Sequence, residues 1–152
     1  MSTGPNRMPE GATPEQVLDI ARQMNEGTLM ERLGMEWVEV GLDRVVARMP
    51  VDGNTQPFGL LHGGATAALC ETVGSVGTSV HVGLERRPVG IQLSVNHLRA
   101  VAGGHVTATG TPIHVGRTTA LWDVLVEDDG GRRVAAGRLT LAIRDGSPGG
   151  GS

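Results

Sequence analysis

The chain has 152 residues, 39% of them apolar, and a net charge of −3, which favours one globular domain with its own hydrophobic core. This charge supplies no basic field for nucleic acid or for an anionic membrane surface. No apolar run approaches the roughly 20 residues that a membrane-spanning helix needs, and residues 1–11 lack the features of a secretory signal. The one cysteine, Cys70, cannot form an internal disulfide, so the expected location is a reducing compartment, by default the cytoplasm.

Both ends of the chain are polar and carry glycine and proline. Residues 1–12 and 145–152 are therefore expected to be disordered tails, and residues 13–144 are expected to form a single domain. At the start of this domain, Thr13 can cap a helix whose first residue is Pro14, which predicts a short N-terminal helix.

That helix is expected to end near Gly27. Two strands are predicted at 35–40 and 45–49, because apolar and polar residues alternate there, with a turn at 41–44 between them. Residues 51–61 are rich in turn formers and are expected to form a loop.

A long helix is predicted from Gly63 to about Val82, where small and apolar residues predominate. Its many alanine, glycine and serine residues allow a sheet to approach closely. The glycines lower the intrinsic stability of the helix, so packing must hold it. One apolar face is expected to comprise Ala65, Ala68, Leu69, Thr72 and Val76.

Four more strands are expected after a turn at 83–88. In the first of them, Ile91, Leu93 and Val95 are expected to point the same way. The last two should be joined by a hairpin turn at 128–131, Asp-Asp-Gly-Gly. Because the connections are short, the four strands are expected to be antiparallel, and one sheet around one buried helix is an α+β fold.

The junction between the loop and the long helix, residues 56–64, is the best candidate for a ligand site. A helix that begins at Gly63 leaves N–H groups of its first turn unpaired, at the positive end of the helix dipole. Such a position can polarise a carbonyl and hold an oxyanion. A plain tight turn at Gly63 and Gly64 would give the same short motif, and on spacing alone that interpretation is favoured.

Glu71 is the one Asp, Glu, Lys or Arg between Gly53 and Gly83, and Ser75 lies one turn further along the predicted helix. A carboxylate on an apolar helix is costly to bury, so it either faces solvent or serves a site, and we favour the site. Eight residues separate it from Gly63, which is about 12 Å along one helix. If both act on one substrate, a second copy of the chain must supply one of them.

Arginine and histidine residues flank the turns of the later strands and could bind phosphate, although each alone is more often an ordinary exposed residue. These are His97, Arg99, His114 and Arg117. No histidine has the spacing of a zinc site, so neither a metal nor another cofactor is expected. Cys70 has no evident base beside it and is expected to be a buried small residue rather than a nucleophile.

Two segments carry a resemblance to a known family: Gln56-Pro-Phe-Gly-Leu-Leu-His-Gly-Gly-Ala65 and Ala68-Leu-Cys-Glu-Thr-Val-Gly-Ser75. Together with Val-Gly-Ile-Gln-Leu-Ser-Val-Asn-His-Leu-Arg and Pro-Ile-His-Val-Gly-Arg further on, they resemble the hotdog-fold acyl-CoA thioesterases of the phenylacetate-pathway (PaaI-like) type. That family includes enzymes acting on 4-hydroxybenzoyl-CoA and on 1,4-dihydroxy-2-naphthoyl-CoA. Each motif is weak alone, but their order and spacing from about Leu33 to Arg144 are specific.

The resemblance implies a hotdog fold, with an antiparallel sheet wrapped around the long helix, and homodimers with shared active sites that pair into homotetramers. It places Glu71 at the catalytic position, as nucleophile or as general base for water, and gives the thioester carbonyl to the N–H of Gly63. Gln56 and His62 match positions that orient the substrate and leaving group, and Ser75 matches one that helps place water. Positions matching contacts to the CoA nucleotide and pantetheine arm are Gly90, His97, Leu98, Arg99, Ala100, His114, Val115, Gly116, Arg117, Thr118 and Thr119.

The function expected from this resemblance is hydrolysis of an acyl-CoA, with an aromatic acyl group favoured, to the free acid and CoA. The alternative is a non-catalytic acyl-CoA-binding hotdog module, which would need no carboxylate at position 71. A hotdog hydratase would need an Asp/His pair in a motif that the chain does not contain. The sequence does not fix the acyl group, because small changes in the pocket walls shift selectivity by only about 1–3 kcal/mol per methylene.

Overall fold

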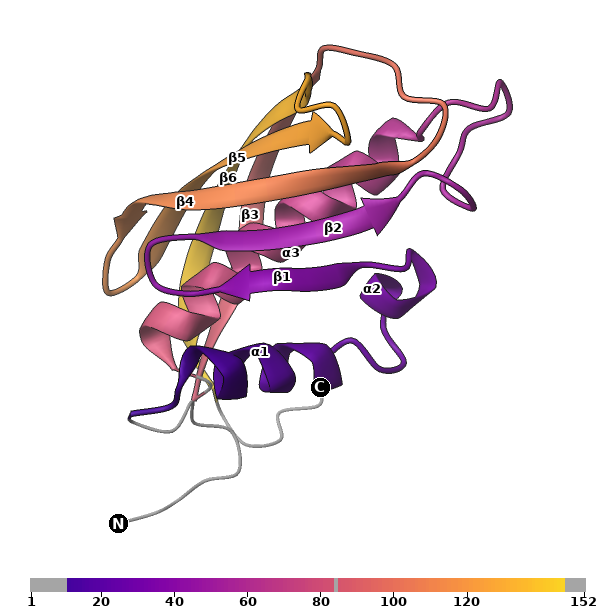
Figure 1. Cartoon of the computed structure of the whole chain (residues 1–152). Coiled ribbons are helices and arrows are strands. Elements are labelled where there is room, and N and C mark those ends of the chain that lie inside the picture. The colour runs from indigo at the N-terminus through magenta and orange to yellow at the C-terminus, as the bar shows by residue number, and fades with distance from the viewer. Residues whose placement is uncertain (1–10, 84, 147–152) are drawn as a thin grey trace.

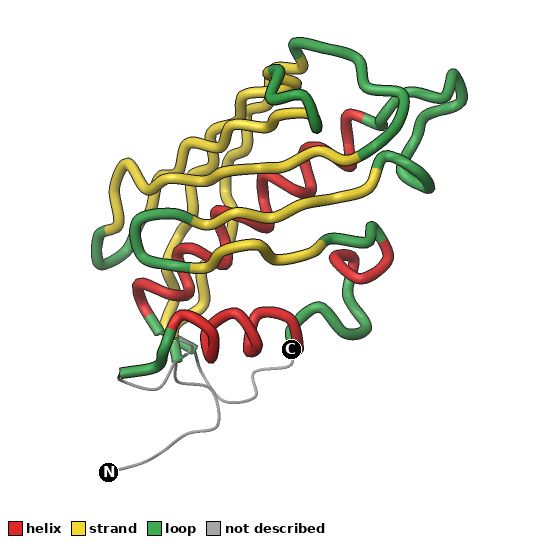
Figure 2. The backbone as a smooth tube through the Cα atoms, in the orientation of Figure 1, coloured by secondary structure: helices red, strands yellow, loops and turns green. Residues whose placement is uncertain are grey.

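The computed structural model describes residues 11–83 and 85–146, which form a single sheet folded around a long helix (Figure 1). The elements are α1 (Pro14–Gln23), α2 (Leu29–Arg32), β1 (Glu36–Val40), β2 (Val45–Pro50), α3 (Gly63–Val82), β3 (Arg86–His97), β4 (His105–Val115), β5 (Thr119–Asp128) and β6 (Arg133–Asp145). The six strands lie in the order β1-β2-β4-β5-β6-β3, and all neighbours are antiparallel. This is the predicted α+β architecture, with α3 against one face of the sheet and α1 beside β1 (Figure 2).

The two predicted tails, 1–12 and 145–152, fall largely outside the described residues. The C-terminal tail was predicted to start at Asp145, but this residue is the last of β6. Asp145 pairs there with Arg86 of β3, and a carboxylate oxygen lies 3.3 Å from the Arg86 Nε.

The N-terminal helix begins as predicted but is shorter. The Thr13 hydroxyl accepts the Gln16 N–H at 3.2 Å, and the Gln16 side chain accepts the Thr13 N–H at 2.9 Å. The helix ends at Gln23 rather than near Gly27, and the separate short helix α2 was not predicted. Local turns separate the two helices. In these turns the Asn25 side chain is bound to β1, where it accepts the indole N–H of Trp37 at 2.9 Å.

The long helix has the predicted bounds, but its buried face is rotated from the predicted one. Ala68, Thr72 and Val76 are only half-buried. The hydrophobic repeat of the sequence predicts the wrong face because glycine contributes little to such a repeat. In the structure, glycines of α3 make the closest approach to the sheet. The buried residues of α3 are Ala65, Thr66, Leu69, Cys70, Val73, Gly74, Gly77 and Thr78.

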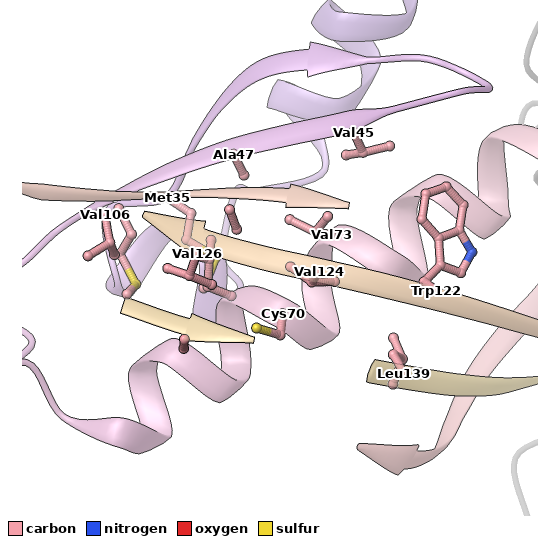
Figure 3. Packing of buried hydrophobic residues seen from close by; sticks show 14 of the residues in the cluster. Met35, Val45, Ala47, Cys70, Val73, Val106, Trp122, Val124, Val126 and Leu139 are labelled. Carbon is pink, nitrogen blue, oxygen red and sulfur yellow. The ribbon is translucent and has the colours of Figure 1, made fainter. Parts of the chain in front are cut away.

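Trp122 of β5 and Leu139 of β6 fill the space opposite these glycines (Figure 3). A Cβ built on Gly74 would lie 2.6 Å from Leu139 Cδ2, and one built on Gly77 would overlap the Trp122 ring. Both large side chains are fully buried. The helix and the sheet therefore meet without room for a further carbon at either position.

The strand β3 differs from the prediction in its start and in the direction of Ile91. It starts at Arg86, inside the predicted turn, and tolerates Pro88 because it is an edge strand. It pairs with β6 and not with β4, the next strand along the chain. A bulge between Gly90 and Gln92 shifts the alternation, so Ile91 is 61% exposed and does not share the inward face of the following residues.

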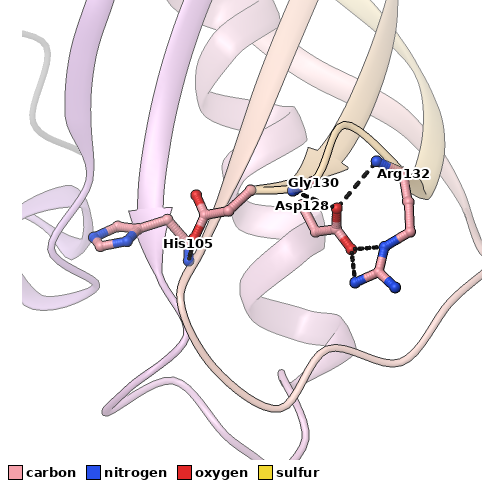
Figure 4. A network of polar contacts seen from close by, with 5 residues as sticks. His105, Asp128, Gly130 and Arg132 are labelled. Carbon is pink, nitrogen blue, oxygen red and sulfur yellow. Dashed lines mark hydrogen bonds and ion pairs between the residues drawn. The ribbon is translucent and has the colours of Figure 1, made fainter.

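The predicted hairpin between β5 and β6 is present at 128–131, and Asp128 holds it closed (Figure 4). One carboxylate oxygen accepts the N–H groups of Gly130 and Arg132 at 2.9 and 3.0 Å, and the other accepts the Arg132 side chain at 2.8 Å. These bonds from Arg132, backbone first, lower the pKa of Asp128. Asp129 ties the hairpin to the start of β4 by accepting the His105 N–H at 2.9 Å.

Candidate active site

The start of α3 leaves one backbone donor free. His62 is the N-cap residue, and its Nδ1 accepts the Gly64 N–H at 2.8 Å while its carbonyl accepts the Ala65 N–H at 3.0 Å. No acceptor for the Gly63 N–H occurs among the residues that the structure describes. This N–H stands at the positive end of a 20-residue helix, which makes it a suitable donor to a carbonyl oxygen or an oxyanion.

A concavity of about 420 Å³ opens at this helix start. His97 lies close over the helix start, since a Cβ built on Gly63 would sit 3.0 Å from its Nε2. The Gln56 side-chain oxygen accepts the Phe58 N–H, so its amide NH₂ is the group left to donate to a ligand. The lining residues are Gln56, Leu60, Leu61, Gly63, Thr66, His97, Leu98, Arg99, Ala100, Val101 and Val134.

Glu71 lies two turns further along α3, outside this concavity, and its carboxylate rests against Gly90 of β3. The side chain is half-buried, and burial raises the pKa of its carboxyl. Within residues 11–83 and 85–146, no hydrogen bond or ion pair involves this carboxylate. Ser75 follows one turn later and is also half-buried.

Cys70, next to Glu71, is fully buried, and burial raises the pKa of its thiol to about 12. The thiol is therefore protonated at neutral pH and unsuited to nucleophilic attack, in agreement with the prediction.

The remaining predicted residues, 114–119, lie at the turn between β4 and β5, beside the start of β3. Arg86 there donates from Nη1 to the Arg117 carbonyl at 2.7 Å. His97, at the other end of β3, is eleven residues away, which is roughly 36 Å along the strand. Within a single chain, the predicted residues thus form three separate groups beside β3. One group lies at the start of α3, the second at Glu71 and the third at the β4–β5 turn.

Sequence reasoning missed three residues that complete the concavity and lie outside the predicted junction 56–64, namely Thr66, Val101 and Val134. Thr66 follows Gly63 by three residues on the helix, a spacing that could have placed it near the site. Val101 and Val134 carry no chemical signal in the sequence.

A larger concavity of about 750 Å³ lies on the sheet face opposite α3. Its lining includes Asp123 and Arg138, which form an ion pair at 2.7 Å, and none of the predicted site residues. In the described stretches of the chain, no three His, Cys, Asp or Glu side chains are grouped to hold a metal ion. None of the described helices combines the length and hydropathy required to cross a membrane.

Comparison with known proteins identifies the family. Residues 58–135 match the family described as the thioesterase superfamily. The chain is 42% identical over 127 residues to the proofreading thioesterase EntH of Cronobacter turicensis, covering 83% of this chain and 93% of that protein. It is 38% identical, with the same two coverages, to the 1,4-dihydroxy-2-naphthoyl-CoA hydrolase of Escherichia coli K12.

Solved structures agree with this assignment. Thioesterase HI1161 of Haemophilus influenzae superposes with a TM-score of 0.80 at 36% identity, covering 88% of this chain and 92% of that one. A mutant of thioesterase PA1618 of Pseudomonas aeruginosa gives 0.81 at 35% identity, covering 84% and 94%. The chain belongs to the thioesterase superfamily and has its hotdog fold, and its class is that of the thioester hydrolases.

Proposed function

We propose that this chain hydrolyses an acyl-CoA with a compact, aromatic acyl group to the free acid and CoA, as a PaaI-like thioesterase. Glu71 acts as the general base for water, and the Gly63 N–H binds the thioester oxygen. The proposed reaction uses no metal and no other cofactor, and CoA enters as part of the substrate.

The observation that carries the proposal is the environment of the Glu71 carboxylate. It is half-buried without a hydrogen-bonding partner among the described residues, and its pKa is raised. A structural carboxylate in such a position would be expected to have a partner. A raised pKa brings the carboxylate closer to the operating pH, where a general base is most effective.

A site shared between two subunits explains why the groups lie apart in one chain. The β1 edge of the sheet is covered by α1, whereas β3 is an edge strand with Val89 and Ile91 51% and 61% exposed. Antiparallel pairing of β3 with β3 of a second copy would bring the Gly63 end of one subunit toward Glu71 of the other. It would also bring residues 114–119 of one subunit toward His97 of the other, where CoA would bind. Two such dimers would form the tetramer.

The reaction then follows from the groups available. Glu71 takes a proton from water as the water oxygen attacks the thioester carbon. The negative charge that develops on the carbonyl oxygen is held by the Gly63 N–H, with the Gln56 amide as a second donor. When the C–S bond breaks, the CoA sulfur leaves with the proton that Glu71 carries, which regenerates the carboxylate.

Two features favour a compact aromatic acyl group. The relative from E. coli is named for an aromatic CoA thioester. In addition, the tight contact of Gly74 and Gly77 with the sheet leaves no space between helix and sheet at those positions for a long acyl chain. We therefore propose that the acyl group binds at the boundary between the two subunits, outside the hydrophobic core.

The test is thiol release from a panel of aromatic and aliphatic acyl-CoA thioesters. Wild type should turn over an aryl-CoA, Glu71→Gln should lose at least a hundredfold in kcat, and Glu36→Gln, an exposed glutamate on β1, should match wild type. Turnover that survives in Glu71→Gln would refute the base assignment. CoA binding by a folded wild type that hydrolyses no thioester would favour the non-catalytic binding module.

A further inference from the structure

The carboxylate of Glu71 rests on a position of β3 that has no side chain. All three of the atoms nearest to an ideal Cβ on Gly90 belong to the Glu71 carboxyl group. This Cβ would overlap Oε1 and would lie 2.8 Å from Cδ and 3.1 Å from Oε2. Any other residue at position 90 would therefore occupy the space that the carboxylate now fills.

The backbone itself does not require glycine at this position. Gly90 is not among the described glycines with positive φ, so an alanine would be compatible with its conformation. It pairs with Leu141, which faces the core, so a side chain at 90 would point toward α3. The bulge begins at Gly90 and turns the next residue, Ile91, outward, so the position lies at a local irregularity of the free edge. Bulges of this kind are common beside active sites.

We propose that Gly90 is a positioning residue for the catalytic carboxylate: its missing side chain forms the seat that holds Glu71 against the β3 edge, where substrate would reach it. This inference rests on the proposed role of Glu71. It gives Gly90 a different function from the CoA contact that the family resemblance implied.

The seat affects catalysis more than stability, because the group that a Cβ would displace can move. The carboxylate is the free end of a flexible side chain with no hydrogen-bonding partner among the described residues. In Gly90→Ala it would swing away with little loss of folding energy. A displacement of about 1 Å of a reacting group can reduce turnover by 10²-fold.

A double-mutant cycle tests the seat directly. Glu71→Asp withdraws the carboxylate by one methylene, about 1.5 Å, and makes room for a methyl group at position 90. We expect Gly90→Ala to lower kcat at least tenfold in the Glu71 background, with KM and Tm little changed. In the Glu71→Asp background the same change should cost less than threefold. Gly103→Ala, which adds a methyl group to an exposed loop with nothing within 4 Å, is the matched control.

A second readout separates positioning from a general structural effect. Once displaced from β3 toward water, the Glu71 carboxyl should recover a pKa nearer its usual value, so the acid limb of the pH–rate profile should move to lower pH in Gly90→Ala.

Three results would overturn the seat: unchanged kcat in Gly90→Ala, an equal loss in both backgrounds, or unfolding of the variant. Turnover that persists in Glu71→Gln would instead refute the proposed function, so the two failures are distinguishable.

Discussion

Replacing Gly63 by proline deletes one backbone N–H and should leave the rest of the helix start intact. Gly63 is the first residue of α3, a position where proline is favoured because its N–H has no partner within the helix. The preceding residue, His62, has φ −68° and ψ 128°, an extended conformation that a following proline accepts. The Gly64 N–H remains capped by His62, so the helix keeps its own cap.

The expected effect is large on catalysis and small on stability. Loss of one oxyanion-binding donor costs about 10²–10³-fold in kcat, or about 2.7–4 kcal/mol of transition-state stabilisation. Gly63→Ala is the matched control, since it adds a Cβ but keeps the N–H. That Cβ would lie 3.0 Å from Nε2 of His97, an exposed ring that can shift. We therefore expect the alanine variant to lose far less activity than the proline variant.

The assay is steady-state hydrolysis of the best aryl-CoA from the panel, with Tm measured for each variant. The proposed shared site allows a quantitative check, because Gly63→Pro and Glu71→Ala would disable different halves of it. Mixing the two after subunit exchange should restore about a quarter of wild-type activity, since half of the random dimers are mixed and each has one complete site of two. Equal kcat values for the proline and alanine variants would refute the donor role of Gly63. No recovery despite proven exchange would refute the shared site.

Three further predictions concern stability and pH. Gly77→Ala should lower the free energy of unfolding by about 1–3 kcal/mol, because the new methyl group would overlap the buried Trp122 ring. Calorimetry should show a Tm lower by about 2–4 °C for each kcal/mol lost. An unchanged Tm would contradict the packing argument. Burial raises the pKa of Glu71 above 4.5 in the folded state, so stability falls as pH rises from that value through the raised pKa. Glu71→Gln should therefore raise Tm at neutral pH and not at acid pH, and a rise at both would point to another cause. The bonds from Arg132 lower the pKa of Asp128 from its usual value of 3.8. The ionised carboxylate therefore stabilises the fold at pH values above 3.8, and this stability is lost as the pH falls through the lowered pKa. Asp128→Asn should unfold at a lower temperature at neutral pH, and this difference should shrink in acid; a difference independent of pH would rule out the carboxylate charge as its source.

Local signals carried most of the secondary structure. The long helix could be predicted with its bounds because small and apolar residues predominate from Gly63 to Val82 and a turn begins at Gly83, and both signals are local in the sequence. The strand order could not be predicted in the same way, because pairing is a tertiary property. The 12-residue strand β3 lies beside β6, which begins more than thirty residues later, and not beside β4.

In the candidate site, too, the features with a local signal could be predicted from the sequence and the tertiary contacts could not. Gly63 and Glu71 could be selected from the sequence because each has an individual chemical reason, a helix start and an isolated charge. The bulge at Gly90 could not, because the inserted residue interrupts an alternation that looks regular in the sequence. Nor could the contact between Gly90 and Glu71, which joins residues nineteen apart through the packing of α3 on the sheet edge.

One substitution, glycine to alanine, should separate the physical demands that the fold places on three glycines. At Gly77 the obstacle is the fully buried ring of Trp122, which has no free space to enter, so the energy is lost from folding. At Gly90 the obstacle is the end of the Glu71 side chain, which can move, so the loss should fall on catalysis if Glu71 has the proposed role. At Gly63 the proposed requirement is for the N–H and not for space, so alanine should be tolerated and proline should remove the activity. The three positions therefore differ in what they require, and Tm and kcat measured together would separate the packing requirement at Gly77 from the proposed catalytic requirements at Gly90 and Gly63.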